Sequence, residues 1–252
     1  KTTFVLSASG RIESENKLDL SGGPRLILAG CETGNIFHVH RKVDDAMARA
    51  LEALAADEPP LFHPQGSPHH LDEYVALLSP AEEQVGQGLN YVFPPEFTYD
   101  HQVTLVTSGT SAGAEMGLAT SFGDVMPSGL KDLGFRDPAD IWEPWCIVLV
   151  DGKIASIADT VRAGEAGVEV GVDTVPELRG RGLGSAATAE WALHPAIRDR
   201  VRFYGHAKSN DSSRRPGVSR NGLGCAISAR VCGSRKYGPR LERSRAEKTA
   251  EP

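Results

Sequence analysis

Apolar and polar positions along the first half of the chain alternate in a way that predicts a mixture of strands and helices. Strands are expected over residues 24–30, 36–40 and 103–108, and helices over residues 44–56 and 69–78. Asp44 can cap the first helix, in which Leu51 and Leu54 fall on one face. Residues 1–23 and 109–129 have no regular period, so we expect an irregular edge and a long connector there.

The pattern becomes sharper from Trp145 onward. Asp151 and Gly152 separate two apolar runs, and this pair supplies the positive φ angles of a tight turn, which predicts a β-hairpin. Val168, Val170 and Val172 then alternate with polar or small residues, as in a half-buried strand. A further strand is expected over residues 201–207, and a helix starting near residue 210 should break early at the following Pro-Gly pair.

A glycine-rich loop lies between the strand at residues 168–174 and the next helix. Its sequence is Arg179-Gly180-Arg181-Gly182-Leu183-Gly184-Ser185. Glycines allow an anion to approach the backbone, the helix N-terminus offers N–H donors, and arginines add charge and bidentate hydrogen bonds. This loop is suited to a diphosphate; the alternative is a flexible turn with solubilising arginines.

Two common diphosphate loops fit this segment poorly. A Walker loop needs a Gly-Lys-Ser/Thr sequence, which the chain lacks. A Rossmann fingerprint can be forced onto Gly182, Gly184 and Ala187, but the preceding strand carries Glu169 and Asp173 instead of being wholly apolar. No acidic residue ends the following strand either, so the Rossmann interpretation fails.

The residues resemble another family, the GNAT superfamily (GCN5-related N-acetyltransferases). Arg179-x-x-Gly182-x-Gly184 is similar to its Arg/Gln-x-x-Gly-x-Gly/Ala signature, and Asn210-x-x-Ser213 is similar to the start of its following helix. The match is specific over residues 145–210, while the N-terminal part resembles the extra region of a bacterial subgroup. The resemblance implies an α+β fold in which helices flank a mixed, mostly antiparallel sheet, together with an N-terminal α+β layer.

The resemblance also implies a site for acetyl-CoA as co-substrate, with no metal. The residues expected to bind it are Val172, Asp173, Thr174, Arg179, Gly180, Arg181, Gly182, Leu183, Gly184, Ser185, Asn210 and Ser213. Glu169 is the candidate general base, because its spacing from the arginine loop is close to that of the family's catalytic glutamate; the alternative is a polar strand residue or a structural hydrogen-bond acceptor. The tyrosine that relatives place after Asn-x-x-Ser is absent, so Tyr204 or Tyr237 is the candidate acid.

Composition and charge set wider limits on the protein. The hydrophobic content of 40% with 24% charged residues is globular, and Gly 27 in 252 residues exceeds the usual share. Residues 198–252 carry 14 basic and 5 acidic side chains, against 13 and 28 in the rest of the chain. The basic quarter suits the phosphates of CoA; nucleic acid is disfavoured because aromatic residues are sparse there.

The sequence predicts three parts: an N-terminal α+β region over residues 1–140, an acetyltransferase domain over 141–238 and a charged tail over 239–252. No membrane span or signal-peptide pattern is present and the four cysteines are not paired in spacing, so a cytoplasmic protein is expected. A metal ion could be bound by His38 with His40, or by His69 with His70. Neither pair has further ligands at a suitable spacing, so we expect ordinary surface or packing histidines.

Two functions from different classes remain open. The first is an N-acetyltransferase that transfers an acetyl group directly to a primary amine of a small molecule or peptide. The second is a CoA-binding or regulatory protein that has lost its catalytic acid, suggested by Pro216 and Gly217 after Ser213. The sequence does not identify the amine, and it leaves the oligomeric state open, a homodimer included.

Overall fold

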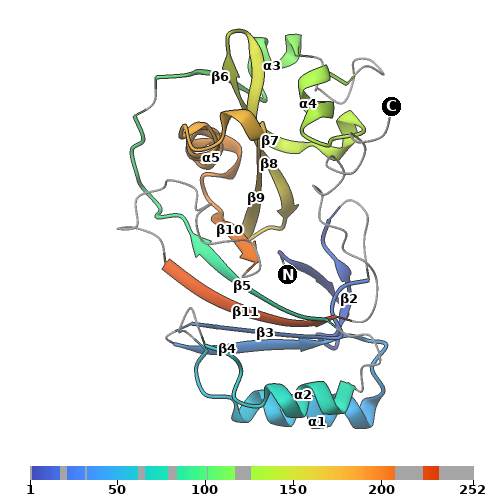
Figure 1. Ribbon diagram of the computed structural model, residues 1–252. Helices are drawn as coiled ribbons and strands as arrows, with labels where there is room; N and C mark the ends of the chain where they lie inside the picture. Colours follow the sequence, from blue (N-terminus) through green and yellow to red (C-terminus); the bar gives the residue numbers. More distant parts are fainter. Residues whose placement is uncertain are drawn as a thin grey trace, which may run out of the picture.

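The computed structural model describes residues 2–17, 22–31, 33–61, 66–78, 84–100, 102–116, 126–207 and 224–232 (Figure 1). Its strands are β1 (Phe4–Leu6), β2 (Ile12–Glu15), β3 (Leu26–Cys31), β4 (Gly34–Val39), β5 (Gln84–Val92), β6 (Thr104–Thr107), β7 (Trp142–Val150), β8 (Lys153–Ala163), β9 (Gly167–Thr174), β10 (Val201–Ala207) and β11 (Gly224–Cys232). Its α-helices are α1 (Asp45–Asp57), α2 (Leu71–Leu78), α3 (Ser111–Glu115), α4 (Ser128–Asp132) and α5 (Leu183–Leu193), and short 3-10 helices cover Pro138–Asp140, Pro176–Leu178 and Pro195–Ile197.

One mixed sheet runs through the described part of the molecule. Its nine strands follow the order β4-β3-β11-β5-β10-β9-β8-β7-β6, and β1 and β2 form a separate hairpin. Within the large sheet, β9 and β10 are parallel and the other described neighbours are antiparallel. The predicted fold class is therefore confirmed: an α+β protein with helices flanking a mixed, mostly antiparallel sheet.

Strands β7 and β8 are covered on both faces, which explains why β7 is apolar without a break from Trp145 to Val150. On one face, Cys146, Val148 and Ala158 pack with helix α5. On the other face, Ile147 and Ile157 pack with Leu130 of α4. Helix α5 itself lies between the sheet and the segment that joins β5 to β6, whose Phe97 and Tyr99 pack against the same cluster (Figure 1).

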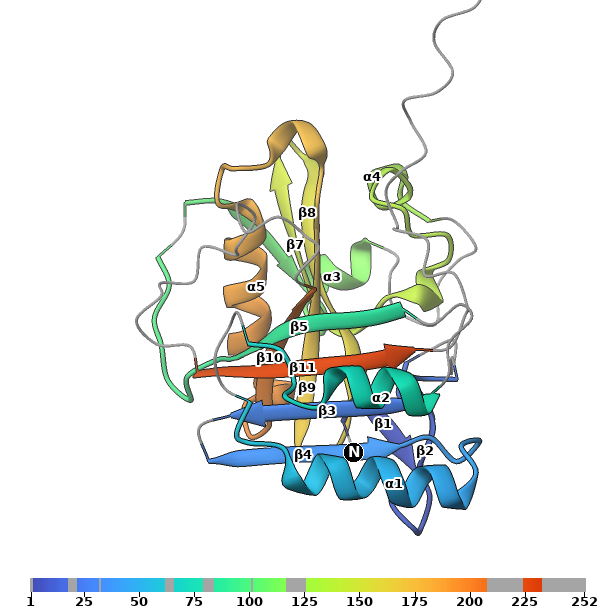
Figure 2. The ribbon, with the colours of Figure 1, turned by 60° about the horizontal axis from the view of Figure 1, so that its bottom comes forward.

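The N-terminal part builds a second core on the far end of the same sheet. Leu26 and Leu28 of β3 face α1 and α2, which lie beneath β3 and β4 in Figure 1 and side by side in Figure 2. Ile27 points to the opposite face, where it packs with Phe4 and Ile12 of the β1–β2 hairpin. The side chains of β3 thus alternate between two covered faces.

Most predicted elements are confirmed within a few residues. The hairpin turn is the clearest case, because Asp151 has φ 52° and Gly152 has φ 72°. The expectation of an irregular edge over residues 1–23 was wrong, since β1 and β2 form a hairpin whose turn contains Gly10 at φ 79°. The connector over 109–129 likewise contains α3 and the start of α4. The helix expected near residue 210 lies outside the described residues.

Strand β5 belongs to the N-terminal region but lies between β10 and β11, both from the C-terminal half (Figure 2). It pairs with β10 over residues 88–92 and with β11 over residues 84–92. The predicted boundary between residues 140 and 141 therefore crosses one continuous sheet, and its status as a domain boundary stays a prediction. None of the described helices has both the length and the apolar content that crossing a membrane requires.

Candidate functional site

The glycine-rich loop lies between the end of β9 and the N-terminus of α5. Gly180 has φ 79° and Gly182 has φ 78°, which is the left-handed region where a side chain is strained. A Cβ atom on either residue would have no other atom within 4 Å, so both positions border open space. Gly182 is the N-cap of α5 and supplies no side chain to cap it. The loop therefore presents backbone, not side chains, at this end of the helix.

The first turn of α5 provides donors that the helix does not use internally. Its first intrahelical bond runs from the Ala186 N–H to the Gly182 carbonyl at 3.0 Å. The N–H groups of Leu183, Gly184 and Ser185 precede that bond and point along the axis toward the loop. Together with the positive end of the helix dipole, they favour an anion at this position.

Gly184 serves a different purpose from the other two loop glycines. A Cβ atom there would lie 3.1 Å from Oγ1 of Thr174 and 3.2 Å from Cγ1 of Val172. The absence of a side chain lets α5 pack closely on the end of β9. The predicted Val172, Thr174 and Gly184 thus form one contact, which fixes the helix N-terminus against the strand.

Polar contacts hold the end of β9 and the start of the loop. Ser156 of β8 donates its hydroxyl to the Asp173 carbonyl at 2.8 Å and shares a 2.8 Å contact with the Thr174 hydroxyl. Arg179 donates from Nε to the Thr174 carbonyl at 3.1 Å, while its guanidinium stays exposed, as does Arg181. Arg179 is therefore anchored at the strand end while both arginines can meet a ligand from solution.

The pairing between β9 and β10 stops midway along β9. Residues 167–170 of β9 pair with residues 201–204 of β10. Beyond Tyr204, β10 stays paired with β5 on its other edge but is no longer paired with β9. Residues 171–174 continue along β9, paired with β8 on the other side. The predicted pantetheine-binding segment Val172 to Thr174 thus lies where the two parallel strands part, directly before the glycine loop.

Glu169 lies in the paired part of β9 and is 7% exposed. Its Oε2 accepts a hydrogen bond from Nη1 of Arg162 at 2.6 Å. The same guanidinium donates from Nη2 to Glu15 at 3.2 Å, and Lys17 contacts Glu15 at 2.9 Å. Burial lowers the pKa of Arg162, but the two carboxylates outweigh burial and the net direction is upward. Sequence reasoning missed both partners: a bulge between Thr160 and Arg162 sets the register of Arg162 against Glu169, and Glu15 comes from the distant strand β2.

Tyr204 lies on the other face of the sheet from Glu169. It pairs with Val170, the residue after Glu169, and packs against the cluster that includes α5. Burial raises the pKa of the Tyr204 phenol, and Asp173, Tyr91 and Glu169 raise it further. The phenol is therefore protonated at neutral pH, as an acid must be. Asn210, Ser213 and Tyr237 lie outside the described residues.

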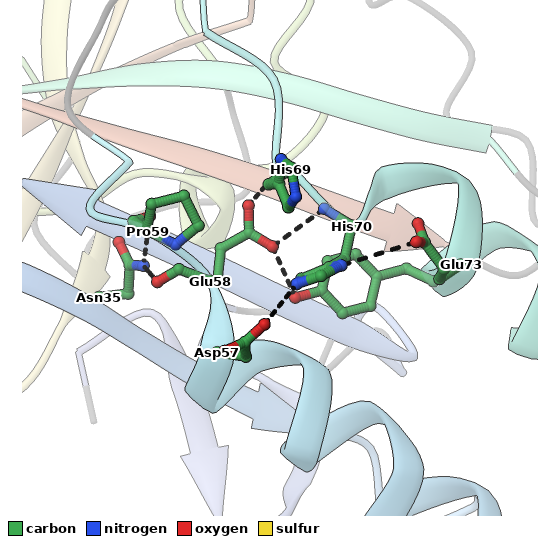
Figure 3. Close-up of polar contacts among 8 residues, drawn as sticks. Asn35, Asp57, Glu58, Pro59, His69, His70 and Glu73 are labelled. Atoms are coloured by element: carbon green, nitrogen blue, oxygen red, sulfur yellow. Dashed lines mark hydrogen bonds and ion pairs between the residues drawn. The ribbon is translucent and has the colours of Figure 1, made fainter.

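The histidine pairs have structural partners. His70 contacts Asp57 at 3.1 Å and Glu73 at 3.6 Å, and the backbone N–H groups of His69 and His70 donate to the buried Glu58 (Figure 3). His38 and His40 each contact a backbone carbonyl, of Gly10 and Gly22 respectively. Within the described ranges, no group of three or more His, Cys, Asp or Glu side chains is arranged to hold a metal ion.

Comparison with known proteins gives low similarities. No protein-family model and no curated protein matches the chain. A Novosphingobium aromaticivorans protein assigned to the GNAT family is 22% identical, with 62% of this chain and 70% of that chain covered and a TM-score of 0.41. A GCN5-related N-acetyltransferase from Kribbella flavida is 20% identical, with 66% and 65% covered and a TM-score of 0.39. A GCN5-related N-acetyltransferase-like protein from Streptococcus suis is 15% identical, with 82% and 84% covered and a TM-score of 0.41. These similarities are too low to assign a function, so the evidence on function is the geometry of the glycine loop and of β9 in this chain.

Proposed function

We propose that this chain is an N-acetyltransferase of the GNAT superfamily, which transfers the acetyl group of acetyl-CoA to a primary amine. One observation carries the proposal. The loop that contains Gly180 and Gly182 leaves the N-terminus of α5 uncovered by side chains, and this helix end lies beside the point where the pairing of β9 with β10 stops. An anion-binding helix end next to a strand end with a diverging neighbour suits a long ligand that carries a diphosphate. Acetyl-CoA has that shape and charge.

The loop residues fit the diphosphate of this co-substrate. The N–H groups at the start of α5 would donate hydrogen bonds to its oxygens, and Arg179 and Arg181 would add charge-assisted hydrogen bonds. Val172, Asp173 and Thr174 would lie along the pantetheine arm. When bound, acetyl-CoA supplies the acyl group as a thioester.

The remaining residues have roles in proton transfer. Glu169 would take a proton from the ammonium of the acceptor, which leaves a lone pair on nitrogen for attack on the acyl carbon. A β9 N–H would stabilise the charge on the acyl oxygen. Because Tyr204 lies on the face of the sheet opposite Glu169, the departing sulfur would take its proton from solvent. The C–N bond forms first and places negative charge on the acyl oxygen; the nitrogen then loses its second proton to solvent, and the C–S bond breaks.

We propose direct transfer in a ternary complex, and Cys146, the cysteine buried against α5, does not support an acyl-enzyme. A covalent route needs a reactive thiolate. Burial raises the pKa of the Cys146 thiol, and the charge of Glu190 raises it further, so this thiol is a poor nucleophile. Initial-velocity lines should therefore intersect when both substrates are varied; parallel lines would contradict direct transfer.

A pair of glycine variants tests the co-substrate site. Gly182 and Gly10 have nearly the same φ, 78° and 79°, and neither has another atom within 4 Å of an added Cβ. G182A and G10A should each lose about 1 kcal/mol of folding stability, because alanine is strained in this region. Only G182A should weaken acetyl-CoA binding, measured by calorimetry, since its Cβ enters the anion site. Equal affinities for the two variants would overturn the site.

Turnover separates the enzyme from a CoA-binding protein of the same fold. Release of CoA would be followed with a thiol reagent against a panel of primary amines, for the wild type and for E169Q. An enzyme should release CoA with at least one amine, and E169Q should slow release by about 10²-fold. Binding of acetyl-CoA without any release, together with no effect of E169Q, would favour the regulatory alternative.

A further inference from the structure

A cavity of about 330 Å³ lies between helix α3 and the start of strand β7. Residues 109–111, Gly113 and Ala114 line it from α3 and the loop before it, and Glu143 and Trp145 line it from β7. Helix α3 lies next to β6, the strand at this edge of the sheet (Figure 1). Three of the lining residues are glycine or alanine, so space remains beside the indole ring of Trp145. Pockets that bind small organic molecules start at about this volume.

The indole N–H of Trp145 is buried and lacks an acceptor among the described residues. Trp145 is 1% exposed, and its Nε1 makes no hydrogen bond within that part of the chain. Trp191 is buried to a similar degree, but its Nε1 donates to the Thr160 hydroxyl at 3.1 Å. Buried donors in folded proteins nearly always have an acceptor, because an unpaired donor loses its hydration without compensation. This N–H is therefore available to a ligand that can reach it.

The edge of the indole ring that carries Nε1 faces α3, where the cavity lies. A Cβ atom on Gly113 would lie 3.2 Å from Cη2 of Trp145, so this corner of the ring is against the helix. In an indole, Cη2 and Nε1 belong to the same edge of the ring. Both Gly113 and Trp145 line the cavity, so an acceptor inside it can approach the N–H.

The other polar groups around the cavity narrow the class of ligand. The Thr110 hydroxyl donates to the Thr107 carbonyl at 2.7 Å, so its proton is already used. The ligand must therefore bring an acceptor for the Trp145 N–H. Glu143 is exposed and carries a negative charge beside the cavity, which disfavours an anionic acceptor. A carbonyl oxygen is an uncharged acceptor that needs no acceptor of its own.

We infer that this cavity binds a small uncharged molecule whose carbonyl oxygen accepts the Trp145 N–H and whose apolar part lies against Gly109, Gly113 and Ala114. The inference goes beyond the proposed acetyl transfer and does not depend on it. The cavity borders β7, whereas the glycine loop and Glu169 belong to β9 and the start of α5, and β8 lies between β7 and β9.

The first test measures binding of cyclohexanone to the full chain in the absence of acetyl-CoA. In the assigned NMR spectrum, the ketone should move the Trp145 indole N–H signal downfield in a saturable way, because the N–H gains an acceptor. The Trp191 indole N–H already has one and should stay in place. Cyclohexylammonium has a similar ring but no acceptor, and should leave both signals unchanged. Equal shifts of the two tryptophans, or no shift of Trp145, would overturn the inference.

Two alanine positions on α3 test whether the ligand occupies the cavity. Ala112 and Ala114 are both exposed, but only Ala114 lines the cavity. A114L should fill the space and abolish the saturable shift, while A112L should bind cyclohexanone as the wild type does. The same side chain is added to the same exposed helix in both variants, so A112L controls for folding. Unchanged binding in A114L would show that the ketone binds elsewhere and would contradict the site.

E143Q tests the charge of the ligand. Cyclohexanecarboxylate carries a similar ring with a charged acceptor, and it should bind the wild type more weakly than cyclohexanone does. E143Q should strengthen binding of the carboxylate, because a negative charge beside the cavity is removed, and should leave the ketone unaffected. Tighter binding of the carboxylate than of the ketone to the wild type would show an anion site and contradict the inferred class of ligand.

Discussion

At the scale of single residues, the buried charges around Glu169 balance one another. Arg162 lies between Glu169 and Glu15, and Lys17 contacts Glu15 from the outside. Glu15 belongs to β2, far from Arg162 in the sequence. Two carboxylates and two cations leave no net charge in a place where an unpaired ion would be costly. The first strands of the chain thus stabilise the carboxylate that we propose to act on the amine.

Replacing Arg162 with methionine should destabilise the protein strongly. Both carboxylates would stay buried without their shared partner, and loss of one member of a buried pair costs about 3 kcal/mol or more. Urea unfolding would measure the change in the free energy of unfolding. R41M is the matched control, because Arg41 also contacts a glutamate but is 60% exposed, and it should cost less than about 1 kcal/mol. Similar losses for the two variants would show that the buried pair is not special.

His40 makes stability depend on pH. Its Nδ1 accepts the Lys42 N–H at 3.0 Å and its Nε2 contacts the Gly22 carbonyl at 2.6 Å, which fits the neutral ring with the proton on Nε2. Burial lowers the pKa of His40 below its ordinary 6.5, and the charges of Lys42 and Arg41 act in the same direction, although hydrogen bonds to backbone carbonyls oppose them. A lowered folded-state pKa means that the stabilisation is complete above pH 6.5 and is lost as the pH falls through the folded value.

The comparison of wild type with H40Q isolates this effect. The difference in the free energy of unfolding between the two proteins should shrink on going from about pH 8 to about pH 5. Taking a difference removes the contribution of His70, whose pKa is raised by Asp57 and Glu73 against desolvation and which therefore acts in the opposite direction. A difference that stays constant over this range would show that His40 does not titrate as described.

At the scale of elements, helix α2 depends on a residue that precedes it by thirteen positions. Glu58 accepts hydrogen bonds from the N–H groups of His69 and His70 at the start of α2 and from the Tyr74 hydroxyl at 3.0 Å. A carboxylate at a helix N-terminus satisfies donors that the helix leaves unused and interacts with its dipole. Burial raises the pKa of Tyr74, and its bond to Glu58 raises it further. Figure 3 shows how this arrangement joins the ends of α1 and α2.

Removing this cap should cost more than removing the neighbouring charge. E58A should lose about 2 kcal/mol, because it leaves two backbone donors and a buried hydroxyl without their acceptor. D57A is the control: the Asp57 side chain is 80% exposed and contacts only His70 among the described contacts, so its loss should stay below about 0.5 kcal/mol. Thermal unfolding of both variants measures this, and equal losses would contradict the role of Glu58 as a cap.

Local chemistry explains which elements the sequence could predict. The β7–β8 hairpin follows from Asp151-Gly152, and β9 with the glycine loop follows from alternation and turn residues. Strand β5 was missed because its sequence contains two glycines and little apolar alternation, and its pairing on both sides with β10 and β11 stabilises it instead. Such a strand forms because of its tertiary contacts, and these contacts cannot be predicted from the local sequence pattern.

Some residues of the candidate site could likewise be predicted from the local sequence, and others depend on how the strands pair. The loop residues from Arg179 to Ser185 could be predicted as a candidate anion site because such a site at a helix N-terminus is local in sequence. Glu169 was predicted as the base, but Arg162 and Glu15, which complete its buried charge group, come from two other strands that only the fold brings to it. The position of Tyr204 on the opposite face from Glu169 likewise depends on the pairing of β9 with β10.

At the scale of the whole molecule, strand β5 joins the two halves that the sequence suggests are separate. It follows α2 in the chain, yet it is hydrogen-bonded to β10 on one side and β11 on the other. Phe93, just after β5, packs with Trp191 of α5 at a ring-centroid distance of 6.3 Å. The N-terminal core and the core around α5 therefore share a strand, and separating them would break main-chain hydrogen bonds on both sides.

Unfolding should accordingly be a single cooperative step. The three tryptophans, Trp142, Trp145 and Trp191, all lie in the C-terminal half, so their fluorescence reports on that half alone. Far-UV circular dichroism includes α1 and α2, which form the largest helical part of the N-terminal half. Because the halves share β5, the urea transitions from the two signals should coincide. A fluorescence transition at clearly higher urea than the circular dichroism transition would show that the predicted boundary near residue 140 divides two independent folding units.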